Sequence, residues 1–268
     1  MTTSFIGALQ KRTPLLGAFI SLNTTYAAQI MARSGFDWLL IDMEHSPLSA
    51  HMANDLVHAT ITASQGSCVP VIRVPSHGVE WIKWALDSGV SAIIVPMVNN
   101  KAEVDLILKR ACYPPLGQRS SGPFRTPFAD LEEKTTSFAN YVSKKSKEVI
   151  VMAMIESVEG IENAEAIITT EGVGGIFVGP VDLRSSMGLP GSDGDETIYL
   201  DGLKKILSIA KRISIPVGIL GSQDNMARQV EMGFDYFLLA GDAALLVQGA
   251  ELVLGKANAT LKQQVVRK

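Results

Sequence analysis

The chain has 268 residues, with 24 lysines and arginines against 27 aspartates and glutamates, and a formal net charge of −3 at pH 7. The basic residues form no long run, which argues against nucleic acid as a partner, and no apolar stretch approaches the ~20 residues of a membrane-spanning helix. Because its two cysteines, Cys68 and Cys112, form no Cys-x-x-Cys pair, we expect free thiols and a cytoplasmic protein.

The first expected element is a strand over residues 16–22. Lys11 and Arg12, followed by a short apolar run, resemble the charged and apolar regions of a signal peptide. Pro14 opens the segment, however, and polar residues from Ser21 onward follow the apolar run at once. A strand therefore explains this segment better than a targeting sequence.

A recurring pattern predicts four more strands. Each time, an amphipathic segment ends in a glycine, and an apolar run rich in β-forming residues begins within three residues. Glycine just past a helix end takes the left-handed conformation without steric cost, so each instance indicates a helix end that leads into a strand. The instances are Gly35 before 38–41, Gly89 before 92–95, Gly172 before 175–178 and Gly233 before 236–239.

Three further apolar runs, at residues 69–74, 149–155 and 216–220, bring the expected strands to eight, each followed by a segment able to form a helix. Continuous apolar runs are typical of parallel strands covered by helices. Eight such units in a chain close to ~250 residues predict an α/β fold, a single-domain (β/α)8 TIM barrel spanning residues 1–268. An open doubly wound sheet is the alternative, since periodicity does not distinguish closure.

Two loops and one helix have features of their own. The longest break runs from Tyr113 to Pro127 and contains four prolines, which is typical of a functional lid or a disordered segment. A second loose stretch, Gly188 to Asp195, follows the sixth expected strand. The final helix, expected over residues 241–261, carries apolar residues on much of its surface, so we expect it to contact another subunit.

The candidate site consists of the polar residues that follow the expected strands, because active sites of such barrels lie at the C-terminal ends of the strands. These residues come from four different strands and would meet at one mouth. The second strand leads into Asp42, Glu44 and His45, the third into Arg73, the fifth into Glu156, and the sixth into Gly179, Pro180, Val181 and Asp182.

Glu156 and Asp182 are the candidate metal ligands. Glu156 follows a run of seven apolar residues, where a carboxylate is costly unless a cation or hydrogen bonds meet it. Asp182 lies on the next loop, and two carboxylates without a neighbouring Cys or His suit an oxygen-preferring ion such as Mg²⁺ or Mn²⁺. The alternatives are a salt-bridged rim residue for Glu156 and a helix cap for Asp182.

The other candidates suit binding and proton transfer. Arg73 offers a planar set of donors that matches a substrate carboxylate, unless it pairs with a neighbouring acid. His45, with Asp42 three residues before it, is placed for proton transfer near neutral pH. The backbone at residues 179–182 is a candidate anion site. His77, in the loop after Arg73, is expected to face water.

At these residues the sequence resembles the HpcH/HpaI aldolase family, the class II pyruvate aldolases. The similarity extends through nearly the whole chain. It rests on Asp42-Met43-Glu44-His45, Pro70-Val71-Ile72-Arg73-Val74-Pro75, Val95-Pro96-Met97-Val98, Tyr113-Pro114-Pro115-Leu116-Gly117-Gln118-Arg119, Ile155-Glu156-Ser157 and Gly179-Pro180-Val181-Asp182-Leu183.

The resemblance implies a metal-dependent barrel, usually a homohexamer built as a trimer of dimers. In it, Glu156 and Asp182 would hold Mg²⁺, Mn²⁺ or Co²⁺, while Arg73 and the backbone beside Asp182 bind pyruvate. His45, oriented by Asp42, would transfer a proton. The implied activity is cleavage or formation of a carbon–carbon bond between pyruvate and an aldehyde, with oxaloacetate decarboxylation as an accompanying activity.

Some positions depart from the family pattern or fit it less closely. Bacterial aldolases of this group often have Gly at the position of Met43, Gln at that of Met154 and Gly at that of Ser120, so the second substrate is open. Asp87 matches a position near a site shared between subunits, unless it serves only as a helix end.

Other activities stay open as well. A relative of the macrophomate synthase type would decarboxylate oxaloacetate and join the enolate to another molecule. A CoA-thioester lyase of the citrate-lyase β type would need a basic CoA-binding region, which is not evident. From a different class, the chain would be a non-catalytic barrel that binds a 2-oxo acid.

Overall fold

The computed structural model describes residues 4–11, 14–124, 126 and 138–266, without the side chains of residues 264–266. Its strands are β1 (Leu15–Ile20), β2 (Trp38–Asp42), β3 (Val69–Arg73), β4 (Ala92–Val95), β5 (Ile150–Ile155), β6 (Val173–Val178), β7 (Val217–Leu220) and β8 (Tyr236–Gly241). Each strand pairs in parallel with the next along the chain, and β8 pairs with β1, so the sheet closes. The predicted (β/α)8 barrel is confirmed, and the open sheet is excluded.

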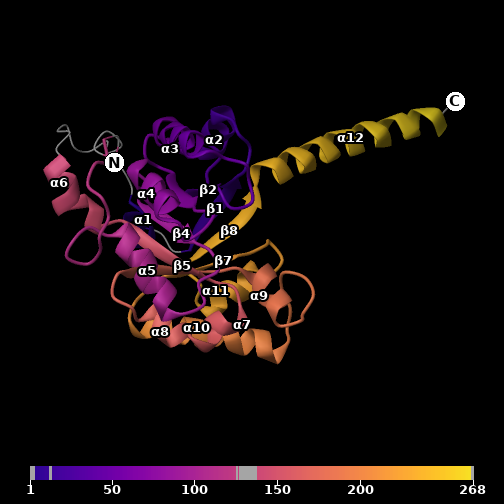
Figure 1. Cartoon of the computed structure of the whole chain (residues 1–268). Helices are drawn as coiled ribbons and strands as arrows, with labels where there is room; N and C mark the ends of the chain where they lie inside the picture. The colour runs from indigo at the N-terminus through magenta and orange to yellow at the C-terminus, as the bar shows by residue number, and fades with distance from the viewer. Residues whose placement is uncertain (1–3, 12–13, 125, 127–137, 267–268) are drawn as a thin grey trace.

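Helices connect and surround the strands (Figure 1). They are α1 (Phe5–Lys11), α2 (Thr25–Ala32), α3 (Ala50–Ser64), α4 (Val79–Asp87), α5 (Lys101–Ala111), α6 (Phe138–Ser143), the 3-10 helix η2 (Lys145–Lys147), α7 (Val158–Glu162), α8 (Ala164–Ile168), α9 (Pro180–Ser186), α10 (Thr197–Arg212), α11 (Met226–Met232) and α12 (Asp242–Val266). Two short helices follow β5, and a short and a long helix follow β6, where one helix each was expected.

The four glycines that were expected to end helices all have the predicted backbone conformation. Their φ angles are 98° at Gly35, 94° at Gly89, 101° at Gly172 and 104° at Gly233. These values lie in the region that side chains with a Cβ rarely adopt, which is why glycine is placed there. The glycines thus mark the N-terminal end of the barrel, where each following strand begins.

The N-terminal end of the barrel is closed by α1, a helix that the sequence pattern did not predict. Phe5 is fully buried, and its ring meets Trp38 and Tyr236 edge-on, with centroids 5.6 and 5.2 Å away. Gly17 and Gly218 make room for these large interior rings, because a Cβ on either glycine would lie within 2.2 Å of a Trp38 or Tyr236 ring atom. The barrel interior is therefore a packed core and not a channel.

Helix α12 has 25 residues and extends away from the barrel towards the C-terminus (Figure 1). Its apolar side chains face outward, with exposed fractions of 57 to 67% at Leu246, Val247, Leu252, Val253, Leu254 and Leu261. Even so, neither α12 nor any other helix in the described part of the chain combines the length and hydropathy needed to cross a membrane.

Candidate active site

Arg73 lies at the barrel mouth, where β2 and β3 end side by side. Its Nε and Nη2 each donate to Asp42 at 2.8 Å, and its Nη1 lies 2.9 Å from Glu44 Oε2. The guanidinium carbon also stands 5.5 Å from the centroid of the Phe19 ring. Both Arg73 and Asp42 are buried. The donors expected to meet a substrate carboxylate are thus paired with two acids of the same chain.

The loop after β2 is fixed by Asp42. Its Oδ1 accepts hydrogen bonds from the backbone N–H groups of Glu44, at 3.1 Å, and of His45, at 3.5 Å. The His45 side chain is 68% exposed, and its Nε2 lies 3.9 Å from Glu44 Oε2. Among the described contacts, therefore, Asp42 orients the backbone of His45, and Glu44 is the acid beside its imidazole.

Glu156 follows β5 and is buried, with 3% of its surface exposed. Its Oε1 accepts a hydrogen bond of 2.7 Å from the backbone N–H of Met97. Burial, with smaller contributions from the charges of Glu44 and Asp182, raises the pKa of Glu156 to about 7, even though the Met97 hydrogen bond and Arg73 oppose the shift. Its Oε2 lies against Gly179, where a Cβ would stand only 2.2 Å from that oxygen. Gly179 is therefore the residue that permits the close approach of β6 to this carboxylate.

Asp182 is exposed and lies in the first turn of α9. The described structure records no hydrogen bond to its carboxylate, and Gly179 at the start of α9 has no side-chain cap. The first backbone hydrogen bond of this turn runs from Leu183 N to Gly179 O at 3.0 Å, so the N–H groups of Val181 and Asp182 precede it. The mouth thus offers both a carboxylate and backbone donors at this point.

The charges at the mouth do not balance. Among the described residues, the carboxylates of Asp42, Glu44 and Glu156 act on the guanidinium of Arg73, and Asp182 adds a fourth negative charge near Glu44 and Glu156. In the described residues, no group of three or more His, Cys, Asp or Glu side chains forms a complete metal cage. Mg²⁺ is usually bound through one or two carboxylates, with water and substrate as the other ligands, so Glu156 and Asp182 fit such an ion.

Asp87 is not brought to this mouth by its own chain. It ends α4 shortly before β4 starts, which places it at the N-terminal end of the barrel. There its Oδ1 accepts a 2.6 Å hydrogen bond from Nη2 of the buried Arg119. Arg119 also lies over the Tyr113 ring, with its guanidinium carbon 4.8 Å from the centroid. Within one chain, Asp87 therefore forms a separate cluster.

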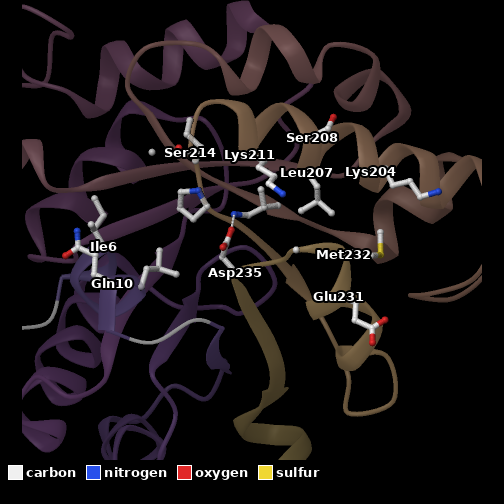
Figure 2. Close-up of a pocket in the computed structure, with 16 residues that line it drawn as sticks. Ile6, Gln10, Lys204, Leu207, Ser208, Lys211, Ser214, Glu231, Met232 and Asp235 are labelled. Atoms are coloured by element: carbon white, nitrogen blue, oxygen red, sulfur yellow. Dashed lines mark hydrogen bonds between the residues drawn. The ribbon is translucent and has the colours of Figure 1, made fainter.

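A hollow of about 970 Å³ also lies at the N-terminal end of the barrel. It is lined by α1, by α10 and by the residues around the starts of β6, β7 and β8, including Gly174, Val217 and Asp235 (Figure 2). None of the candidate catalytic residues lines this hollow. The hollow and the candidate catalytic residues thus lie at opposite ends of the barrel.

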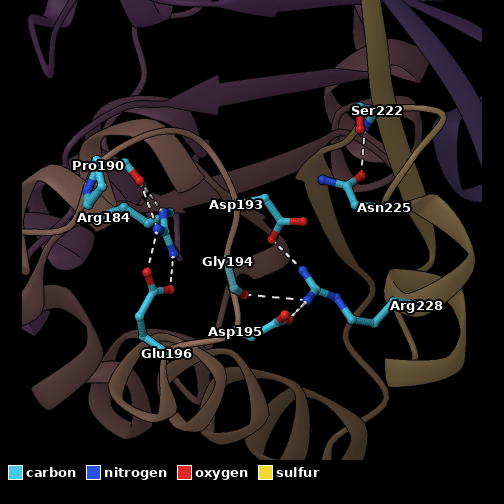
Figure 3. Close-up of polar contacts among 9 residues, drawn as sticks. All are labelled: Arg184, Pro190, Asp193, Gly194, Asp195, Glu196, Ser222, Asn225 and Arg228. Carbon is cyan, nitrogen blue, oxygen red and sulfur yellow. Dashed lines mark hydrogen bonds and ion pairs between the residues drawn. The ribbon is translucent and has the colours of Figure 1, made fainter.

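The loop of residues 187–196 between α9 and α10, here called the rim loop, is held in place by Arg184 and Arg228 (Figure 3). Arg184 donates to the carbonyl oxygen of Pro190 from Nε and Nη2, at 3.1 and 2.7 Å. It also binds both carboxylate oxygens of Glu196, at 2.6 and 3.0 Å. Arg228, on α11, pairs with Asp193. The loose stretch expected after β6 is thus an ordered rim.

Two groups of the mouth were given no role from the sequence. Glu44 was expected at the mouth because it follows β2, but its pairing with Arg73 was not expected. The Met97 N–H carries no sequence signal, because it reaches Glu156 only through a left-handed backbone with a φ of 52°.

Comparison with known proteins identifies the class. The fold and the acid-rich mouth are those of a barrel enzyme, and the curated relatives are aldolases, which are carbon–carbon lyases. The chain belongs to the HpcH/HpaI aldolase/citrate lyase family, whose model matches residues 15–245.

The relatives match over almost the full length. The hydroxypyruvate/pyruvate aldolase of Roseobacter denitrificans is 32% identical over 94% of this chain and 96% of its own length. The 4-hydroxy-2-oxo-heptane-1,7-dioate aldolase of Escherichia coli is 30% identical over 97% and 96%. The crystal structure of macrophomate synthase superposes with a TM-score of 0.86 at 26% identity, covering 98% of this chain and 93% of that one.

Proposed function

We propose that this chain is an aldolase dependent on a divalent cation, which cleaves 4-hydroxy-2-oxo acids into a pyruvate-type 2-oxo acid and an aldehyde and catalyses the reverse addition. The observation that carries the proposal is the buried carboxylate of Glu156, which faces the charges of Glu44 and Asp182 across the mouth. A carboxylate in such a place is stabilised when a cation binds beside it.

Glu156 and Asp182 would hold the ion, which we propose to be Mg²⁺, Mn²⁺ or Co²⁺. When bound, such an ion supplies Lewis-acid stabilisation of the negative charge that develops on the 2-oxo acid. Gly179 keeps the ion's position open, because any larger residue would press on Oε2 of Glu156.

Arg73 and the backbone of residues 179–182 bind the carboxylate of the 2-oxo acid in this proposal. The guanidinium of Arg73 has a fixed orientation for this binding, since Asp42 and Glu44 contact all three of its nitrogens. The exposed imidazole of His45 takes the proton of the substrate's 4-hydroxyl group as the bond between C3 and C4 breaks, which leaves the aldehyde and an enolate. The enolate then gains a proton at C3, from the protonated imidazole or from water, to give the 2-oxo acid. The reverse addition follows the same steps in the opposite order. A positioned base of this kind contributes ~10²–10⁴-fold to the rate.

We also propose that the enzyme is a homo-oligomer, as a hexamer, in which α12 packs against a neighbouring subunit. The exposed leucines and valines of α12 support this, because so much outward-facing apolar surface is unusual on a monomer. Such an assembly would give Asp87 a route to a site shared between subunits. The free thiols of Cys68 and Cys112 suit a cytoplasmic enzyme.

The test is pyruvate release from 4-hydroxy-2-oxo acids of several chain lengths and from oxaloacetate. The metal-stripped protein is assayed alone and with Mg²⁺, Mn²⁺ or Co²⁺, beside Glu156→Ala and the control Glu159→Ala, which removes an exposed carboxylate three residues away. The proposal is supported if turnover requires the ion, is lost in Glu156→Ala and is kept in Glu159→Ala. Turnover indifferent to ions and to Glu156 contradicts it, and binding of pyruvate without any turnover would favour a non-catalytic barrel.

A second candidate is a decarboxylase of oxaloacetate that joins the resulting enolate to another molecule. The superposition on macrophomate synthase supports this candidate. It predicts that oxaloacetate is consumed much faster than any 4-hydroxy-2-oxo acid in the same assay.

A further inference from the structure

The peptide unit that joins Pro96 to Met97 is hydrogen-bonded at both of its polar ends. Its N–H, on Met97, donates to Oε1 of Glu156 at 2.7 Å. Its carbonyl oxygen, on Pro96, lies 2.7 Å from Nε2 of His77. A carbonyl oxygen only accepts, so the imidazole is the donor. Because a peptide unit is rigid and planar, the imidazole and the carboxylate are joined through a single stiff element.

The backbone at Met97 is held in a costly conformation. Its φ of 52° lies in the left-handed region, which a residue with a Cβ rarely adopts. Packing of the Met97 side chain does not explain this, because that side chain is exposed. Hydrogen bonds hold the segment instead, with Val98 N donating to Met154 O at 3.0 Å and Asn99 Nδ2 to Met97 O at 3.3 Å.

His77 is itself restrained. It lies in the loop after β3, and Arg110 on α5 donates to its backbone carbonyl. The side chain, which was expected to face water, is half-buried against the end of β4. A donor on the carbonyl end of a peptide also polarises its N–H end and strengthens the hydrogen bond made there.

We infer that His77 is a positioning residue for the cation site. It fixes the Pro96–Met97 peptide, the peptide fixes Oε1 of Glu156, and Oε2 is thereby directed to Gly179, where the helix carrying Asp182 begins. The inference rests on the proposed function, because it assigns Glu156 the role of cation ligand. It adds a histidine that touches neither ion nor substrate.

The first experiment measures Mn²⁺ affinity of the metal-stripped full-length protein by the electron paramagnetic resonance of free Mn²⁺. His77→Ala is expected to weaken binding about tenfold, at the low end of the ~10–100-fold effect of outer-shell partners. His77→Gln places an amide N–H where Nε2 stood and should restore most of the affinity. Ser76→Ala, an exposed neighbour in the same loop, is the control and should bind as the wild type does.

The second experiment needs no ion. Hydrogen–deuterium exchange followed by mass spectrometry reports the protection of the amides in peptides that cover residues 96–99 of the metal-stripped protein. Faster exchange in His77→Ala than in the wild type, His77→Gln and Ser76→Ala is expected. Equal exchange and equal Mn²⁺ affinity in all four proteins would overturn the inference. So would a loss of affinity in His77→Ala that His77→Gln does not recover.

The two experiments separate this inference from the proposed function. If the wild type binds no Mn²⁺, the cation-dependent aldolase fails. In that case, faster exchange in His77→Ala still supports the hydrogen-bonded link to Glu156, and unchanged exchange removes it.

Discussion

Two arginines of this barrel are buried to nearly the same degree, and both are paired with acids, yet their surroundings differ. Arg184 is 1% exposed and pairs with one carboxylate, that of Glu196. Arg184 also donates to the carbonyl oxygen of Pro190. Arg73 is 6% exposed and pairs with two acids, Asp42 and Glu44. The first site closes its own charge balance, whereas the second does not.

The difference teaches how to distinguish a structural ion pair from a binding site. Around Arg184 each of the three guanidinium nitrogens donates to the rim loop, and the guanidinium carbon also lies 4.8 Å from the Tyr199 ring centroid. Around Arg73 a third carboxylate, that of Glu156, acts on the same guanidinium, and Asp182 adds negative charge near Glu156. Surplus negative charge in a partly desolvated mouth is unfavourable unless a bound cation offsets it, so the imbalance supports the proposal that the functional site lies at Arg73.

The largest expected effect is that of a substitution at Arg73 on catalysis. Arg73→Lys keeps the charge, but an ammonium group does not span the two oxygens of Asp42 as a guanidinium does. We expect kcat/KM for pyruvate release to fall about 10²–10³-fold, the usual effect of removing one precisely placed donor. Steady-state kinetics on protein with a wild-type circular dichroism spectrum checks this. Activity within a fewfold of the wild type would mean that Arg73 is as structural as Arg184.

A substitution at Arg184 is expected, in contrast, to lower the stability of the protein and to leave kcat nearly unchanged. Arg184→Met leaves Glu196 unpaired, but the Glu196 side chain is 38% exposed and can be solvated, so the free energy of unfolding should fall only modestly. Urea unfolding measures this, and kcat below the unfolding transition should stay within about twofold. A large loss of kcat at unchanged stability would show that the rim loop shapes the reaction.

The fold and the position of the mouth could be predicted from sequence patterns. The strand ends and the helix-ending glycines such as Gly35 and Gly233 were predictable, because backbone conformation and hydrophobic periodicity are local properties. The residues at the mouth followed from the rule that parallel strands end at one edge. The closed eight-stranded sheet and the match to the HpcH/HpaI family confirm the predicted fold and the predicted family.

The unpredicted features depend on contacts between distant segments. Helix α1 is only seven residues long, and it is held by Phe5 packing against rings from β2 and β8. The pairing of Arg73 with Asp42 and Glu44 is a choice of side-chain conformation that spacing does not encode. The link from His77 to Glu156 joins three separate loops and runs through a backbone amide, which any residue except proline would supply.

A smaller effect should distinguish the acids of the two regions. Glu44→Gln removes one of the surplus charges at the mouth, so we expect Mn²⁺ to bind about tenfold more weakly, which corresponds to about 1.4 kcal/mol. Asp193→Asn removes a rim carboxylate that pairs with Arg228, and it should leave the affinity within about twofold. Titration of both variants with Mn²⁺ decides the matter. Equal weakening would mean that the ion responds only to the overall charge of the chain.

The smallest expected effect is the pH dependence of the stability that the Arg184–Glu196 ion pair contributes. Hydrogen bonds from Arg184 lower the pKa of Glu196 from its ordinary value of 4.5 to about 2. Since the folded pKa is the lower one, the stabilisation is complete above pH 4.5 and is lost as the pH falls towards 2. The difference in urea midpoint between the wild type and Glu196→Gln should therefore be constant above about pH 5 and shrink below it. A difference that stays constant down to pH 2, or that shrinks as the pH rises, would mean that Arg184 acts through packing on Tyr199 and not through this carboxylate.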